Sequence, residues 1–182
     1  MKKVYLAGGI SDTARKNYQK ELAKKIRDLG YEVYAAAENN SINDKSNNPT
    51  PLDIYNGDIE RVKECDIFVA TISGGNEDGT ISELGMVAGW NEYEYLQKIK
   101  LNKQYEPYKP IKIVAFTTNE RLMTPQFYKG SKEDITGLAS AGYNHLVLGM
   151  IDKWGEFVGN KEDMLNKLKE MKEWLNGLLY VQ

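Results

Sequence analysis

Short apolar runs separated by amphipathic stretches predict strands at residues 4–8, 31–36, 66–71, 111–116 and 145–151. Each run is mostly apolar instead of alternating between apolar and polar residues, which is typical of a parallel sheet covered on both faces. The pattern therefore predicts an α/β fold with three layers. Five strands favour the doubly wound, flavodoxin-like or Rossmann-like order 2-1-3-4-5. We expect residues 1–182 to form a single domain.

Helical spacing of apolar residues connects these strands. We expect helices at about 11–29, 50–65, 80–99 and 161–178, with a point near Gly57-Asp58 where the second could restart. A further short helix is expected near 133–139. The last long helix carries an apolar stripe that either packs on the sheet or forms a subunit contact. Its members are Met164, Leu168, Met171, Leu175 and Leu178.

In a sheet of this order, ligands bind outside the carboxyl ends of strands 1 and 3. Both ends are glycine-rich, at Gly8-Gly9 and Gly74-Gly75, so we expect the two loops to face one crevice. Glycine lets the backbone approach a ligand closely. Three carboxylates, Glu77, Asp78 and Glu83, follow the second strand end. They repel a bare phosphate and suit a sugar or a cation-like transition state, such as the oxocarbenium ion of glycosidic cleavage.

Composition excludes several other classes of function. A net charge of −2 and a pI near 5.6 give no electrostatic reason to expect a nucleic acid polymer or an anionic membrane as partner. The apolar start is too short for a signal peptide or a membrane span. With one cysteine, Cys65, and one histidine, His145, neither a disulfide framework nor a His/Cys zinc site is expected, and the cytoplasm is the default location. His145 lies in a predicted strand, which favours a structural histidine.

Two interpretations of Glu83 are open at this point. Thr80 to Glu83 matches a T-x-x-E capping box, in which the glutamate returns to the first amide of the helix. Alternatively, Glu83 is a reactive carboxylate. The helix dipole would keep it ionised in the first turn, as a nucleophile requires.

Three segments together resemble the nucleoside 2-deoxyribosyltransferases. They are VYLAG with Tyr5, YNGDIERVKECDIFVA with Asp58, and DGTISELG with Glu83. The resemblance covers residues 3–90 well and the remainder in outline. It implies transfer of 2-deoxyribose between nucleobases through a covalent deoxyribosyl-enzyme, without a metal or organic cofactor. The implied partners are a nucleoside or nucleotide, a free nucleobase, and further copies of the chain in a homo-oligomer.

The resemblance also implies roles for individual residues. Glu83 matches the nucleophile, Tyr5 the tyrosine that orients it, and Asp58 an aspartate that transfers a proton to the departing base. Asp78 matches a residue that contacts a sugar hydroxyl, and Asn40 falls near a base-contacting position. Other expected substrate-binding residues are Gly8, Gly9 and Gly79. Taken singly, Tyr5 also suits an ordinary strand aromatic, Asp58 a surface pair with Arg61, and Asp78 a turn.

The main alternative function is hydrolysis. Transferases of this family supply an asparagine after the fourth strand, and Asp134–Leu138 lacks it. Related deoxynucleoside 5′-monophosphate N-glycosidases use the same nucleophile, pass the sugar to water and bind a 5′-phosphate. Ser11, Arg15 and Ser73 or Ser82 could serve that phosphate. A third alternative is a nucleotide-binding domain of the same fold that has no catalytic activity.

Overall fold

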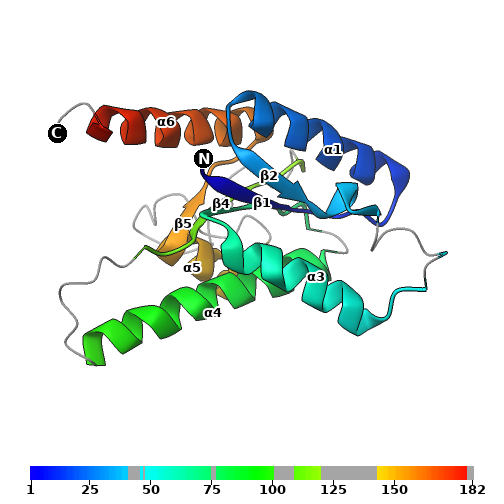
Figure 1. The fold of residues 1–182 in the computed structure, drawn as a ribbon, viewed down its shortest axis with the longest axis horizontal. Helices are drawn as coiled ribbons and strands as arrows, with labels where there is room; N and C mark the ends of the chain where they lie inside the picture. Colours follow the sequence, from blue (N-terminus) through cyan, green and yellow to red (C-terminus); the bar gives the residue numbers. More distant parts are fainter. Residues whose placement is uncertain (41–45, 47, 75–76, 101–108, 120–142, 180–182) are drawn as a thin grey trace, which may run out of the picture.

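The computed structural model describes residues 1–40, 46, 48–74, 77–100, 109–119 and 143–179, with side chains up to residue 173. Within these ranges, a parallel five-stranded sheet lies between two layers of helices (Figure 1). The strand order is β2-β1-β3-β4-β5, which confirms the predicted fold class and order. The strands are β1 (Lys3–Ala7), β2 (Glu32–Ala35), β3 (Ile67–Thr71), β4 (Lys112–Phe116) and β5 (Gly155–Phe157).

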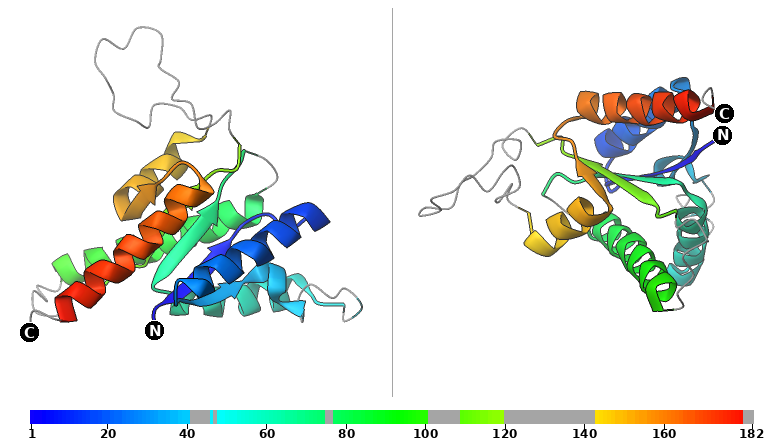
Figure 2. Two further views of the ribbon diagram at one scale, coloured as in Figure 1. Left: turned by 90° about the horizontal axis from the view of Figure 1, so that it is seen from above. Right: turned by 90° about the vertical axis from the view of Figure 1, so that its left-hand side faces the viewer.

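Helices cover both faces of the sheet. Helices α1 and α6 lie side by side on one face, and α3, α4 and α5 cover the other (Figures 1 and 2). No helix in the described ranges is long and apolar enough to cross a membrane. The helical elements are α1 (Thr13–Asp28), η1 (Ala36–Glu38), α3 (Pro51–Glu64), α4 (Asp78–Lys100), α5 (His145–Trp154) and α6 (Lys161–Leu179).

Local signals explain where several helices begin and end. Asp12 caps α1 by accepting a hydrogen bond from the Arg15 amide, and Gly30 follows its end with a φ of 85°, which favours glycine. Thr50 caps α3 in a capping box with Asp53. Helix α3 continues through Gly57-Asp58, so the restart considered there does not occur.

The stripe on α6 packs against the sheet. Met164 and Leu168 are fully buried in the cluster that also holds Val4, Leu6 and Phe116. This confirms the packing interpretation for these two residues, and Met171 packs against the same cluster. Leu175 and Leu178 lie beyond the described side chains.

The prediction of a fifth strand at residues 145–151 is wrong. These residues belong to α5, which buries Val147, Leu148, Ile151 and Trp154 against α4 and the sheet. An apolar run of this length fits a buried helix as well as a strand. Strand β5 follows at Gly155, where a Cβ atom would lie 1.7 Å from the Ile113 carbonyl oxygen. His145 is exposed at the start of α5, and the helix expected near 133–139 lies outside the described residues.

Helix α4 begins at Asp78, two residues earlier than expected, and the Ile81 amide bonds to the Glu77 carbonyl. Thr80 therefore lies inside the helix and cannot be its N-cap. Glu83 consequently lies in the second turn, so the capping-box interpretation is wrong.

Further along α4, the Asn91 side chain accepts from the Ile111 amide and donates to its carbonyl, both at 2.9 Å. This pair attaches α4 to the start of β4.

Candidate active site

A hydrogen bond joins β1 to α4 at the candidate nucleophile. The buried Tyr5 hydroxyl donates to Glu83 Oε1 at 2.6 Å. Burial raises the pKa of Glu83 to about 7; the Tyr5 bond opposes this shift, and the charge of Asp58 adds to it. We expected a carboxylate held ionised by the helix dipole. Because Glu83 is partly buried and one turn further along, desolvation dominates and the carboxyl titrates near neutral pH.

A second hydrogen-bonded group contains Asp58. The Tyr34 hydroxyl donates to Asp58 Oδ1 at 2.9 Å, and Asn39 Nδ2 donates to the Tyr34 oxygen at 2.9 Å. Burial raises the pKa of half-buried Asp58, while the Tyr34 bond lowers it. Arg61 was considered as a surface partner for Asp58. Its Nη1 lies 3.8 Å from Glu64 Oε2 instead, and its guanidinium lies 5.9 Å from the centre of the Tyr34 ring.

An aromatic stack connects the two carboxyl groups. Tyr5 pairs in register with Tyr34 on one side and with Phe68 on the other. The Tyr5 ring centre lies 5.2 Å from that of Tyr34 and 5.6 Å from that of Phe68, both in stacked geometry. Glu83 and Asp58 are therefore each bonded to a tyrosine of one rigid stack, on the α3/α4 face of the sheet.

The two predicted loops meet at a cavity of about 270 Å³ at the carboxyl ends of the strands. Gly9 of the first loop and Ser73 and Glu77 of the second all line it, as expected for one crevice. Ser73 donates its amide to both Glu77 carboxyl oxygens, at 2.8 and 3.0 Å. Burial raises the pKa of Glu77, and the Ser73 amide and Arg15 oppose this shift.

Gln19 of α1 forms the floor of this cavity. Its Nε2 donates to Thr71 Oγ1 at 3.0 Å, and its buried Oε1 has no hydrogen-bond partner among the described residues. A Cβ atom on Gly8 would lie 2.0 Å from Gln19 Nε2. Gly8 is thus required for the close approach of Gln19.

Other predicted residues lie apart from the tyrosine and carboxyl groups. Asp78, Gly79 and Asn40 are exposed and belong to neither hydrogen-bonded group. Asn39, the neighbour of Asn40, contacts Tyr34 instead. Tyr34, Asn39 and Gln19 were not predicted as site residues from the sequence. For Tyr34 a signal existed, because strands 1 and 2 were predicted neighbours and a tyrosine occurs in each.

The Cys65 thiol packs in the same buried cluster as Tyr5. Burial raises the pKa of the Cys65 thiol to about 12, so Cys65 is protonated at neutral pH. Among the described residues, no group of three or more His, Cys, Asp or Glu side chains is arranged to hold a metal ion. The chemistry available at the strand ends is that of carboxyl and phenol groups.

Comparisons with known proteins identify chains with a similar fold. A conserved protein from Enterococcus faecalis V583 is 27% identical, with a TM-score of 0.66 over 94% of this chain and 99% of its own. A 2-deoxyribosyltransferase from Bacillus psychrosaccharolyticus (15% identity, TM-score 0.51, 90% of each chain) shares the fold. The CMP N-glycosidase BcmB from Clostridium botulinum also shares the fold, with 18% identity and a TM-score of 0.50 over 92% of this chain and 98% of its own.

A comparison with curated proteins found no match. A family model described as nucleoside 2-deoxyribosyltransferase matches residues 4–166, a span that includes Tyr5, Asp58 and Glu83. Because this model covers well over half of the sequence, the chain belongs to the nucleoside 2-deoxyribosyltransferase family.

Proposed function

We propose that this protein transfers 2-deoxyribose between nucleobases through a covalent deoxyribosyl-Glu83 intermediate. The observation that carries the proposal is the Tyr5 to Glu83 hydrogen bond at 2.6 Å, which holds a partly buried carboxyl on the α3/α4 face of the sheet. A nucleophilic carboxylate needs a fixed orientation and restricted access to water. Family membership supports a nucleoside or nucleotide as substrate.

The first step in this proposal forms the bond between Glu83 and the sugar. Ionised Glu83 attacks the anomeric carbon through Oε2, since Tyr5 holds Oε1. The N-glycosidic bond breaks, its electron pair leaves with the base, and Asp58 gives the base a proton. A base that leaves neutral is a better leaving group than an anion, so Asp58 lowers the barrier of this step.

The second step reverses the first with a new base. A nitrogen of the incoming base attacks the anomeric carbon, the ester bond to Glu83 breaks, and Asp58 takes up the proton that the base loses. Two inversions give net retention at the anomeric carbon. No other reactant is consumed.

Hydrolysis of a deoxynucleoside 5′-monophosphate is the second candidate. Arg15 and Ser73 line the cavity beside Gly9 and could meet a phosphate. The same cavity contains the buried carboxyl of Glu77, which would repel a dianion. Arg15 is also paired with Asp12 at 3.3 Å. These charges favour a nucleoside over a 5′-monophosphate as the substrate.

Product identity tests these alternatives. The protein is incubated with deoxyadenosine and cytosine, and separately with deoxyadenosine monophosphate alone, and the products are separated by chromatography. Deoxycytidine supports the transferase, release of sugar phosphate supports the hydrolase, and no turnover of either supports a binding domain. Mass spectrometry of protein quenched with deoxyadenosine should show one added deoxyribosyl group, which Glu83→Gln should lack.

The cytoplasmic location and the homo-oligomer stay predictions. Light scattering of the purified protein measures the number of subunits, and a monomeric mass would contradict the second.

A further inference from the structure

We propose that Tyr34 is a positioning residue that orients the Asp58 carboxyl for proton exchange with the base, and that Asn39 sets the direction of its hydroxyl proton. This inference rests on the proposed function. It is based on a chain of hydrogen bonds: Asn39 Nδ2 lies 2.9 Å from the Tyr34 oxygen, which lies 2.9 Å from Asp58 Oδ1.

The direction of these hydrogen bonds follows from the number of protons. A phenol has a single proton to donate. The Asn39 amino group can only donate, so the Tyr34 oxygen accepts from it, and the Tyr34 proton is committed to Asp58 Oδ1. Proton exchange with the base therefore falls to Asp58 Oδ2. Without Tyr34, the carboxyl could rotate and present either oxygen to the base. Only part of its conformations would then be competent for proton exchange.

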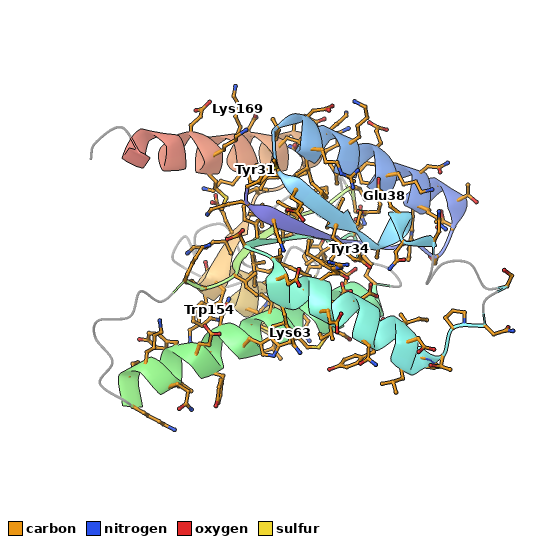
Figure 3. All side chains as sticks on the ribbon, in the orientation of Figure 1. Tyr31, Tyr34, Glu38, Lys63, Trp154 and Lys169 are labelled. Carbon is orange, nitrogen blue, oxygen red and sulfur yellow. The ribbon has the colours of Figure 1, made fainter. Side chains whose placement is uncertain are left out.

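The Tyr34 ring is itself held in place. It stacks on Tyr5 with ring centres 5.2 Å apart and an interplanar angle of 28°, and the Arg61 guanidinium covers it. Tyr34 projects from the sheet toward α3, whereas Tyr31, just before the same strand, lies on the α6 side (Figure 3). The hydroxyl of Tyr34 is thus fixed relative to the tyrosine that holds Glu83.

Titratable groups from three other elements interact with Asp58: Tyr34 of β2, Tyr5 of β1 and Glu83 of α4. Arg61 of α3 lies over the Tyr34 ring. The Tyr34 bond stabilises the Asp58 anion, which opposes the increase in pKa caused by burial. Removing the hydroxyl should therefore raise the pKa of Asp58 as well as release its orientation.

The test uses two substrates with wild type and the variants Tyr34→Phe and Asp58→Asn. Deoxyadenosine needs a proton on its leaving base. A deoxyriboside of an N7-methylated purine does not, because its base is already cationic. We expect Tyr34→Phe to lower kcat/KM for deoxyadenosine about tenfold and to leave the rate for the methylated substrate within about twofold of wild type. Asp58→Asn should show the same selectivity with a larger loss.

The pH profile gives a second measurement. The rate for the methylated substrate follows the ionisation of Glu83, whose pKa is measured in each variant because the charge of Asp58 affects it. With that value fixed, the deoxyadenosine profile yields the pKa of Asp58. We expect this pKa to be higher in Tyr34→Phe than in wild type. Asn39→Ala should change both measurements in the same direction by a smaller amount. Tyr31→Phe is the matched control: it removes a hydroxyl that donates to the Leu168 carbonyl on the opposite face, and it should behave as wild type.

Distinct results would overturn the two proposals. If wild type cleaves neither substrate, the proposed function fails. If wild type is active and Asp58→Asn is selective for the methylated substrate, but Tyr34→Phe matches wild type, the role of Tyr34 is wrong. Equal losses in Tyr34→Phe for both substrates, with an unchanged Asp58 pKa, would show that Tyr34 supports only the fold.

Discussion

The two faces of the sheet carry different side chains along the central strands. Toward α1 and α6, the central strands present larger side chains such as Leu6, Val69 and Phe116. Toward α3 and α4, the aromatic side chains of Tyr5 and Phe68 lie in the middle of β1 and near the start of β3, and small side chains follow later in the strands. The small residues are Ala7, Ala70 and Ala115, which pair in register across β1, β3 and β4. The α1/α6 face thus carries the larger side chains along the central strands, and the α3/α4 face has small side chains beside its tyrosines and carboxyl groups.

The two faces therefore contribute differently to the stability of the fold and to the proposed chemistry. The α1/α6 face buries aliphatic side chains, which contribute to folding through the area they remove from water. The α3/α4 face keeps two carboxyl groups partly out of water, and burial raises the pKa of each. Substitutions on the first face should mainly change stability, and those on the second should mainly change the chemistry.

The largest expected effect is on the α3/α4 face. Glu83→Gln keeps the shape of the side chain and removes the nucleophile, so kcat/KM for deoxyribosyl transfer should fall by at least about 10³-fold. Transfer assays measure the rate, and circular dichroism checks that the fold is retained. Activity within about tenfold of wild type would exclude Glu83 as the nucleophile.

The opposite result is expected on the α1/α6 face. Leu22 is fully buried among α1, α6 and the sheet. Leu22→Ala should lower the free energy of unfolding by about 3 kcal/mol, as measured by urea denaturation. The pH dependence of the remaining activity should stay that of wild type. A changed pKa for Glu83 in this variant would show that the two faces are coupled.

A smaller change should follow from Tyr5→Phe. Loss of a hydrogen bond to a carboxylate costs about 1.5–3 kcal/mol, or about 10- to 100-fold in rate. For a substrate that needs no proton, the wild-type rate should rise as the pH passes through about 7, where Glu83 ionises. Because the Tyr5 bond lowers the pKa of Glu83, its removal should shift this rise to higher pH. A shift to lower pH would contradict the assignment of Tyr5 as the donor.

The smallest expected effect concerns stability on the α3/α4 face. The pKa of Glu83 is about 7 in the folded protein and near 4.5 when unfolded, so the folded state binds more protons between these values. Glu83 therefore destabilises the protein as the pH rises from about 4.5 to 7. The full shift corresponds to about 3 kcal/mol, and the partial solvent exposure of Glu83 reduces this value. Glu83→Gln should therefore be more stable than wild type by about 1–2 kcal/mol at pH 8, and this advantage should vanish below pH 4. Urea denaturation at both pH values measures the difference.

Much of the fold followed from local patterns in the sequence. Strand positions, the end of α1 and the start of α3 depend on apolar runs, Gly30 and Thr50-Pro51, which act through neighbouring residues. The strand order followed from the expected fold class. The fifth strand could not be located in this way. Its three residues are too few to form a pattern, and the longer apolar run before it is a helix.

The candidate site was predictable where a motif carried it. Tyr5 and Glu83 stand in recognisable segments, and their hydrogen bond spans 78 residues of sequence. Tyr34 and Asn39 have no motif, because their importance arises from contacts between side chains of β2, η1 and α3. Asn40 was chosen instead of Asn39 because a sequence alone does not show which of two adjacent amides turns toward the sheet.

The pairing of Tyr5 with Tyr34 across β1 and β2 also has a consequence for folding. Side chains alternate between the faces of a strand, so a shift of β2 by one residue would turn Tyr34 toward α1. Val33 or Ala35 would then stand beside Tyr5, and Asp58 would lose its donor. A misregistered sheet could keep its backbone hydrogen bonds and much of its apolar burial. It would nevertheless lack the Tyr34 to Asp58 contact, so catalytic activity would report on strand register more sensitively than a measure of helix or sheet content.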